Sequence, residues 1–297
     1  MSDEPDHPET PPPSRLYLPK LESPPATILE YVIARFPRIP PRTWHLRVER
    51  GLVTSSDGTP FDEDSPYRHG IFVFYRKEVP FEPAPVEEET ILYHGQELLI
   101  ADKPHGMPVT PAGEYVLRSL LVRLQKSTGI STLAPMHRLD RETAGVVMFS
   151  IRPDTRSHYH QLFAERRIER TYKALGHVYT RPAQRQWRVE NRLGEGVPWF
   201  RRKIVEGTPN AITEIELLQL RKLEGLFSIQ PQTGKKHQIR IHMTSIGFPV
   251  LGDPLYPEIR THEGNFPLQL LAERLRFVDP LSGKTRTFTS ERTLMWT

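Results

Sequence analysis

The fold of this chain is decided by residues 136–149, Met136-His137-Arg138-Leu139-Asp140-Arg141-Glu142-Thr143-Ala144-Gly145-Val146-Val147-Met148-Phe149. Charged and small residues lead directly into the apolar run from Val146 to Phe149, a pattern that predicts a buried strand. The sequence therefore predicts a turn that is anchored to the core and presents several functional groups. Asp140 is the candidate catalytic carboxylate of this turn. The alternative is that Asp140 only accepts backbone hydrogen bonds within an Asp-x-x-Thr-x-Gly turn, a common role for aspartate.

The length and composition predict a soluble globular protein of one large domain or two. The chain has 297 residues, of which 37% are hydrophobic, and its mean hydropathy is −0.50. It has no cysteine, which excludes disulfides, thiolate metal sites and cysteine nucleophiles. No apolar run approaches the length of about 20 residues that spans a membrane. Because the first residues are acidic and rich in proline, the opposite of a secretory signal, we expect the protein in the cytoplasm.

Charge is distributed unevenly along the chain. Residues 1–90 contain 10 Lys/Arg and 16 Asp/Glu, so residues 91–297 contain 30 and 20. A basic domain favours a polyanionic partner such as RNA, because neutralising phosphates releases bound counterions. The alternative is a basic surface that is merely solvated.

The N-terminal part is predicted to contain a tail, a small domain and a linker. Residues 1–25 carry proline clusters and few apolar side chains, so they are expected to form a flexible tail. Residues 26–82 form the predicted domain. Residues 83–90 contain prolines and three consecutive glutamates, a composition typical of a linker. Residues 91–297 then form the second domain.

The predicted domain at residues 26–82 contains two helices followed by a small hairpin. A helix is expected from Thr27 to Phe36, since Thr27 and Glu30 have the spacing of a capping box. A second helix is expected from Arg42 to Arg50, and a strand from Ile71 to Tyr75. This order resembles the S4 RNA-binding fold, in which the turn after the second helix and the hairpin contact RNA. The alternative is a small domain that packs on its neighbour, because the charges of this segment nearly cancel.

The second domain opens with a strand that ends in the turn Lys103-Pro104-His105-Gly106. A cation next to a flexible backbone suits contact with a phosphate, and the alternative is an ordinary proline turn. Helices are expected from Val116 to Lys126, ended by Gly129, and from Asp154, as the N-cap, to Arg167. Residues 184–203 show no clean period and are expected to form loops and a ragged hairpin.

A strand is predicted from Arg170 to Val178. Alternation places Arg170 and Tyr172 on one face and Lys173 on the other. An aromatic ring beside cations is a stacking platform for an unpaired base, and the alternative is a half-buried packing tyrosine.

A second dense stretch covers residues 232–243. Two lysines, Lys235 and Lys236, follow a glycine and precede a segment that alternates in polarity. This alternation predicts a strand with Ile239, Ile241 and Met243 on the core face and with three polar side chains, Gln238, Arg240 and His242, facing a site.

Two other kinds of active site are excluded by missing requirements. The tetrapeptide His-Arg-Leu-Asp at 137–140 superficially matches a kinase catalytic loop, but the glycine-rich loop and the Asp-Phe-Gly of a kinase are absent. A zinc site at His237 and His242 is disfavoured, because two side chains five residues apart on the predicted strand emerge on opposite faces. No metal site is predicted.

The two dense stretches together resemble one enzyme family. Residues 137–145 resemble the catalytic motif of the RluA-type pseudouridine synthases, His-Arg-Leu-Asp-x-x-Thr-Ser-Gly, with Ala144 in place of the serine. Residues 234–242 and 247–256 are similar to that family's Gly-x-x-His-Gln-Ile-Arg-x-His and Gly-x-Pro-x-x-Gly-Asp-x-x-Tyr segments. The resemblance covers nearly all of residues 91–297. It implies an α+β fold with a mixed, largely antiparallel central sheet flanked by helices and loops.

The resemblance also implies roles for individual residues. Asp140 would be the catalytic aspartate, Tyr172 would lie against the target uracil, and Arg240 would pair with Asp140, lower its pKa and keep it ionised. Arg138 would support the site from the backbone or fill the gap left by a flipped nucleotide. Further substrate contacts are expected from His137, Lys103, Lys173, Lys235, Lys236, Gln238 and His242. Two further departures from the family pattern, Leu271 and Asp279, touch none of the three proposed active-site side chains.

The implied reaction isomerises uridine to pseudouridine in RNA. It involves no redox change and no external group, so no cofactor is expected. A carboxylate can either add to a carbon and leave again or remove a proton from the sugar, and the sequence leaves both routes open. The target base must be extruded, and stacking on an aromatic ring offsets that cost. A monomer acting on ribosomal RNA, in preference to transfer RNA, is expected; the competing classes are an RNA-docking protein without the chemistry and a basic enzyme of unrelated mechanism.

Overall fold

The computed structural model describes residues 13–37, 39–76, 82, 87–112, 115–259 and 266–297. The chain divides into two compact units, residues 1–82 and 83–297. Each unit has its own hydrophobic core. The described part of the chain has no helix long and apolar enough to cross a membrane.

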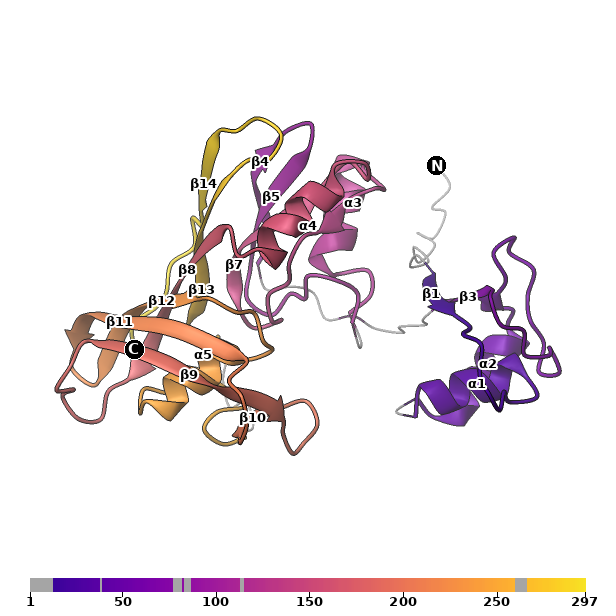
Figure 1. The fold of residues 1–297 in the computed structure, drawn as a ribbon, viewed down its shortest axis with the longest axis horizontal. Helices are drawn as coiled ribbons and strands as arrows, with labels where there is room; N and C mark the ends of the chain where they lie inside the picture. Colours follow the sequence, from indigo (N-terminus) through magenta and orange to yellow (C-terminus); the bar gives the residue numbers. More distant parts are fainter. Residues whose placement is uncertain (1–12, 38, 77–81, 83–86, 113–114, 260–265) are drawn as a thin grey trace, which may run out of the picture. The chain divides into compact units, whose positions relative to one another are not determined.

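The N-terminal unit packs two helices on a small antiparallel sheet with the strand order β1-β3-β2 (Figure 1). Its elements are β1 (Ser14–Tyr17), α1 (Ile28–Arg35), α2 (Pro41–Glu49), β2 (Val53–Thr54) and β3 (Phe72–Tyr75). The predicted capping box is present, because the Thr27 hydroxyl accepts from the Glu30 amide at 3.1 Å and the Glu30 carboxylate accepts from the Thr27 amide at 3.4 Å.

The predicted flexible tail is wrong where it overlaps strand β1. Residues 1–12 lie outside the described residues, but Ser14–Tyr17 pairs with β3. The next residue, Leu18, is fully buried in the core of the unit beside Trp44. This short apolar stretch between proline clusters therefore supplies an edge strand, which proline content alone did not reveal.

The C-terminal unit is built on a mixed, largely antiparallel sheet, as the family resemblance implied. The strand order is β10-β9-β11-β12-β8-β13-β7-β5-β4, with β14 on β13 and β6 on β7, and the β13–β7 pair is parallel. The strands are β4 (Thr90–His94), β5 (Leu98–Lys103), β6 (Ala134–Pro135), β7 (Ala144–Ser150), β8 (Ile168–His177), β9 (Gln186–Glu195), β10 (Arg202–Val205), β11 (Ala211–Arg221), β12 (Glu224–Pro231), β13 (Leu270–Val278) and β14 (Thr285–Thr289). The helices are α3 (Leu120–Thr128), α4 (Arg156–Ala164) and α5 (Gln238–Ser245).

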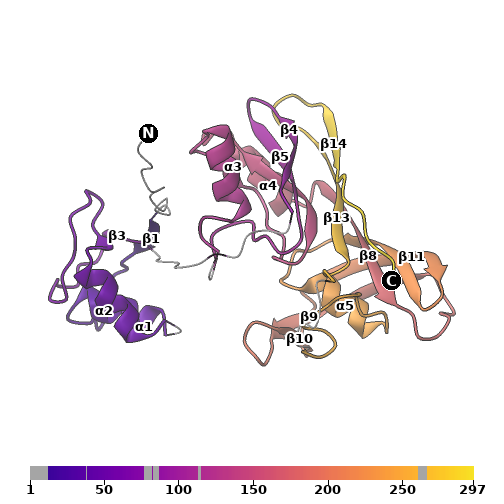
Figure 2. The ribbon, with the colours of Figure 1, turned by 180° about the vertical axis from the view of Figure 1, so that it is seen from behind.

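The predicted strand after the Asp140 turn is β7, and every residue of it is buried. Helices α3 and α4 cover its two faces. Leu120 and Leu124 of α3 pack with Val147 and Phe149, whereas Tyr159 and Leu162 of α4 pack with Val146 and Met148. The two helices can be seen from opposite sides in Figures 1 and 2. This sandwich fixes the start of β7, and with it the turn that carries Asp140.

Gly145 allows β7 to lie against β13. Its φ is +114°, and a Cβ atom at this position would collide with the backbone carbonyl of Ala272 on β13. The two residues are partners in the parallel pair, so the close approach is required by the sheet itself. The glycine that closes the catalytic motif therefore has a packing role.

Several predicted element bounds are corrected. Helix α3 begins four residues later than expected, although Gly129 ends it with a φ of +73°. Thr155, rather than Asp154, precedes α4, because the Asp154 carboxylate pairs with Arg152. Residues 184–203 were expected to form loops and a ragged hairpin, and most of them lie in the regular hairpin of β9 and β10.

The largest correction concerns residues 238–243, which were predicted as a strand and form helix α5. Ile239 and Met243, four residues apart, pack on β11 and β12, while Ile241 packs in a separate cluster with Leu193. The three polar residues between them are also buried. Because polar and apolar side chains are buried alike, their alternation does not report which face meets solvent, and the strand prediction fails.

Candidate active site

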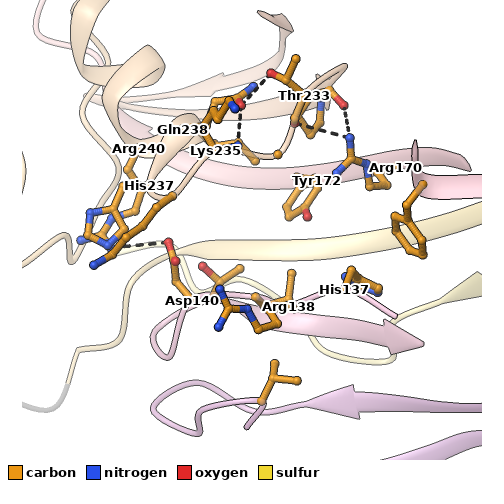
Figure 3. Close-up of a pocket in the computed structure, with 18 of the residues that line it drawn as sticks. His137, Arg138, Asp140, Arg170, Tyr172, Thr233, Lys235, His237, Gln238 and Arg240 are labelled. Atoms are coloured by element: carbon orange, nitrogen blue, oxygen red, sulfur yellow. Dashed lines mark hydrogen bonds and ion pairs between the residues drawn. The ribbon is translucent and has the colours of Figure 1, made fainter. Parts of the chain in front are cut away.

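A cavity of about 880 Å³ in the C-terminal unit joins the two dense stretches of sequence (Figure 3). One wall is the turn 136–141 with the end of α4. The opposite wall is the segment 231–240, which joins β12 to α5, and β8 contributes Arg170 and Tyr172. Asp140, Tyr172 and Arg240 therefore share one pocket, although they are far apart in the sequence.

The Asp140 turn is closed by backbone hydrogen bonds. The Thr143 amide donates to the Asp140 carbonyl at 3.0 Å. The Asp140 side chain is left 29% exposed and faces Arg240, whose Nη1 lies 3.9 Å from Oδ2. The turn therefore uses the backbone of Asp140 for structure and leaves its carboxylate available in the pocket.

Lys103 holds this turn through its backbone. Its side chain is fully buried, and Nζ donates to the carbonyls of Pro104 (2.9 Å), Met107 (2.6 Å) and Arg141 (2.9 Å). Burial lowers the pKa of Lys103 to about 7. Only the ammonium has the three donors that these carbonyls require. Lys103 does not line the pocket, so its predicted contact with a phosphate is replaced by this anchoring of Arg141, the residue after Asp140.

His137 supports the wall next to Asp140. Its Nε2 accepts a hydrogen bond from the Met148 amide at 3.1 Å, and its ring packs 5.1 Å from that of Phe163 on α4. Burial, with a smaller contribution from Arg170, lowers the pKa of His137 to about 3. The imidazole is therefore neutral and joins the turn to both β7 and α4.

Arg240 is held mainly by Asp253. Nε and Nη2 of Arg240 donate to the two carboxylate oxygens of Asp253 at 2.8 and 2.5 Å, and these side chains are only 2% and 1% exposed. The Tyr256 ring lies 5.3 Å from the Arg240 guanidinium. The predicted pair between Arg240 and Asp140 is present only as the longer 3.9 Å contact. Arg240 is thus a preorganised cation that presents Nη1 to Asp140.

The pKa of Asp140 is shifted in the opposite direction from the one predicted. Burial raises the pKa of Asp140 above its usual value, and it outweighs the opposing charges of Arg240, Lys236 and Lys103. Asp253 adds to the rise. Arg240 lowers this pKa as predicted, but the predicted net direction is wrong because burial has the larger effect. The carboxylate is partly accessible but lies deep in the pocket, where hydration is weak.

Tyr172 and Arg170 form the part of the pocket wall that comes from β8. The Tyr172 ring packs against two core clusters and lies between Arg170 and Asp140 in Figure 3. Burial raises the pKa of Tyr172, so the hydroxyl stays protonated. Arg170 donates to the carbonyls of Pro231 (3.1 Å) and Thr233 (3.4 Å), which joins β8 to the segment 231–240.

The other predicted contact residues divide into two groups. Arg138, Lys235, Lys236, His137 and Gln238 line the pocket, whereas Lys103, Lys173 and His242 do not. The Gln238 amide is used internally, since it donates to Thr213 at 2.8 Å and accepts from the Lys235 amide at 3.0 Å. Lys173 pairs with Glu273. His242 is fully buried and hydrogen-bonded to Thr213 and Asn191, so its predicted contact with substrate is wrong.

Because residues 238–243 are helical, His237 and His242 are not separated by the opposite faces of a strand, as was predicted. His237 Nδ1 lies 2.9 Å from the Tyr256 hydroxyl, and His242 is bonded elsewhere. In the part of the chain that the structure describes, no group of three or more His, Cys, Asp or Glu residues is placed to hold a metal.

Sequence reasoning gave no role to Asp253, His237 or Arg166. Asp253 lies in the quoted Gly-Asp-x-x-Tyr segment, but its partner can be identified only once α5 is folded. His237 adopts a left-handed conformation with φ +58° at the start of α5. Arg166 lines the pocket from the end of α4 and lies outside the family motifs quoted above.

The pocket brings together a partly exposed carboxylate, a buried arginine and an aromatic wall. Comparison with known proteins gives the class of protein. Residues 97–245 match the family described as RNA pseudouridylate synthase. The chain is 30% identical over 211 residues to the dual-specificity RNA pseudouridine synthase RluA of Haemophilus influenzae, which covers 68% of this chain and 92% of that protein.

Two further similarities extend the comparison. The ribosomal large subunit pseudouridine synthase D of Zymomonas mobilis is 28% identical over 274 residues, which are 82% of this chain and 83% of that protein. The structure of human RNA pseudouridylate synthase domain containing 1 superposes with a TM-score of 0.59 at 20% identity and covers 73% of this chain and 94% of that one, a likeness of fold alone. The chain belongs to the RNA pseudouridylate synthase family, in its RluA-type branch, and is an isomerase that acts on RNA.

Proposed function

We propose that this protein converts specific uridines of structured RNA to pseudouridine with Asp140 as the catalytic carboxylate. The observation that carries the proposal is the position of Asp140, whose side chain is accessible in the pocket while its backbone is tied into the turn. Lys103 and His137 fix that turn from two sides. The reaction moves the ribose from a ring nitrogen to a ring carbon of the same uracil, so it needs neither an oxidant nor a cofactor.

The target nucleotide enters the pocket as a flipped base and stacks on Tyr172. Extrusion costs a few kcal/mol, and stacking on an aromatic ring returns about 1–3 kcal/mol per base. Arg240 Nη1 stabilises the Asp140 carboxylate in its ionised form when the base excludes water. The carboxylate then either adds to a carbon of the nucleotide or removes a sugar proton, and its position suits both routes. Arg138, exposed on the same turn, contacts the RNA strand from which the base has left.

Ribosomal RNA is the proposed substrate, ahead of transfer RNA. The support is the similarity over 274 residues to a relative named for the large ribosomal subunit, together with an N-terminal unit whose two helices and small sheet resemble the S4 RNA-binding fold. The similarity to a dual-specificity enzyme keeps transfer RNA as the second candidate. Action as a cytoplasmic monomer is part of the same proposal and stays a prediction.

Pseudouridine mapping tests the proposal. Purified protein is incubated with ribosomal RNA and transfer RNA isolated from cells that lack its gene, and modified positions are compared with those in RNA from unaltered cells. We expect a small set of positions in ribosomal RNA to be restored. Binding of both RNAs without any restored position would overturn the proposed activity and favour an RNA-docking protein. Restoration confined to transfer RNA would overturn the proposed substrate.

A further inference from the structure

Three non-glycine residues of the described chain adopt the left-handed backbone conformation, and two of them line the pocket. Their φ angles are +57° at Arg166, +54° at Lys222 and +58° at His237, and Arg166 and His237 are pocket residues. A side chain with a Cβ atom is strained in this conformation, which glycine adopts without cost. Strained residues gather at functional sites more often than elsewhere. Arg166 is therefore a position at which the backbone favours glycine and the sequence has a cation.

The strain at Arg166 follows from the way in which α4 ends. The helix ends at Ala164 and is capped by Glu165. The Arg167 amide then donates to the Leu162 carbonyl at 2.8 Å, and the Arg166 amide donates to Phe163 at 3.2 Å. These two bonds form a Schellman motif, in which the left-handed position is usually glycine. Nothing in this helix ending requires an arginine side chain.

Arg166 lines the pocket just beyond the end of α4. Phe163, three residues earlier on α4, packs against His137, and Figure 3 shows His137 on the opposite side of the pocket from Arg240. The Arg166 side chain is exposed, and within the described residues it has no hydrogen bond or ion pair. Its neighbour Arg167, by contrast, pairs with Glu165 at 2.7 Å. Arg166 is thus an open cation on the rim of a pocket built for a nucleotide.

We propose that Arg166 binds a phosphate of the RNA strand next to the target nucleotide. The inference rests on the proposed function of the pocket and adds a substrate-binding residue to it. A base held at Asp140 remains joined to the strand on both sides, so the strand must pass over the rim. An arginine is suited to a phosphate there, because its planar guanidinium donates two parallel hydrogen bonds. The gain in binding offsets the strain of an arginine at a position where glycine fits better.

Substitution with glycine separates the two properties of this position. Arg166→Gly removes the cation and also relieves the backbone, so the variant should have a melting temperature equal to or above that of the unaltered protein. A matched control is Lys222→Gly, which removes an exposed cation of similar φ. Lys222 lies in the turn between β11 and β12, and β12 runs about 23 Å from there to Pro231 in the pocket wall.

The measurement is the binding of a fluorescein-labelled oligouridylate to each full-length protein at several salt concentrations. Losing one phosphate contact should make the slope of log Kobs against log salt less steep by about 0.7. The loss of affinity relative to the unaltered protein should then be about fivefold larger at 0.1 M salt than at 1 M salt. Arg166→Gly should show this change, and Lys222→Gly and Arg166→Lys should keep the original slope. With RNA that the enzyme modifies, Arg166→Gly should raise KM and leave kcat unchanged.

The binding assay requires no turnover, so its result does not depend on whether the protein forms pseudouridine. An unaltered protein that binds oligouridylate but forms no pseudouridine would overturn the proposed function and leave the role of Arg166 to be judged by the slopes. Equal slopes and equal KM values for Arg166→Gly and Lys222→Gly would overturn the inference. So would an Arg166→Lys slope as shallow as that of Arg166→Gly, because lysine retains the charge.

Discussion

Replacing Asp253 with asparagine should both destabilise the C-terminal unit and make Asp140 a stronger acid. Asp253 is 1% exposed and accepts two hydrogen bonds from Arg240, which is itself only 2% exposed. An asparagine keeps one acceptor oxygen but turns a donor towards the guanidinium and leaves its charge uncompensated. Breaking a buried ion pair costs about 3–5 kcal/mol. Because the amide oxygen can still accept from the Leu255 and Tyr256 amides, we expect about 3 kcal/mol.

The same substitution should also change the pKa of Asp140. Asp253 raises the pKa of Asp140, and it also neutralises the arginine that lowers it. Removing the Asp253 charge therefore lowers the pKa of Asp140. The acid limb of the pH–rate profile should move to lower pH in the variant, provided that the folded fraction is measured at each pH.

Thermal unfolding and pH–rate profiles measure the two effects. For a unit of this size, 3 kcal/mol corresponds to a fall in Tm of about 6–12 °C. The control is Asp154→Asn, which breaks the solvent-exposed pair with Arg152 and should leave Tm nearly unchanged. An equal change in Tm for both variants, or an acid limb that moves to higher pH in Asp253→Asn, would refute the described balance between Asp253, Arg240 and Asp140.

Two further predictions concern the turn and the strand that follows it. Since burial raises the pKa of Asp140, its charged form destabilises the folded protein at neutral pH. Asp140→Asn should therefore raise Tm at pH 7. This gain in Tm should shrink as the pH falls through the raised pKa and vanish below the ordinary aspartate value of 3.8. Thermal scans at several pH values measure it, and a lower Tm for Asp140→Asn at pH 7 would contradict the direction of the shift. Gly145→Ala should cost at least about 3 kcal/mol in urea unfolding, because its Cβ meets the Ala272 carbonyl, whereas Gly283→Ala, with φ +68° and open space around it, should cost about 1 kcal/mol. Similar losses for the two alanine variants would argue against the close contact between β7 and β13.

The sequence predicts those features whose causes are local or are repeated along the chain. The apolar run after Gly145 identifies β7, and the spacing of Thr27 and Glu30 identifies the start of α1. The two dense stretches also identify the walls of one pocket. These features depend on hydrophobic burial and capping, which nearby residues determine.

Features that depend on tertiary partners were not predictable in the same way. Helix α5 buries polar and apolar residues together, so its pattern imitates a strand. Lys103 was expected to meet phosphate, yet its ammonium is enclosed by three backbone carbonyls that only the folded turn brings together. The pairing of Arg240 with Asp253, and the resulting rise in the pKa of Asp140, likewise required the fold.

The most direct test of Asp140 as the catalytic carboxylate is pseudouridine formation by Asp140→Asn protein. The unaltered enzyme and the variant are incubated with the same unmodified ribosomal RNA, after thermal unfolding has shown that both are folded. We expect the unaltered enzyme to form pseudouridine. The variant should still bind the RNA but form pseudouridine about 10²- to 10⁴-fold more slowly. Formation of pseudouridine by the folded variant at the rate of the unaltered enzyme would contradict the assignment.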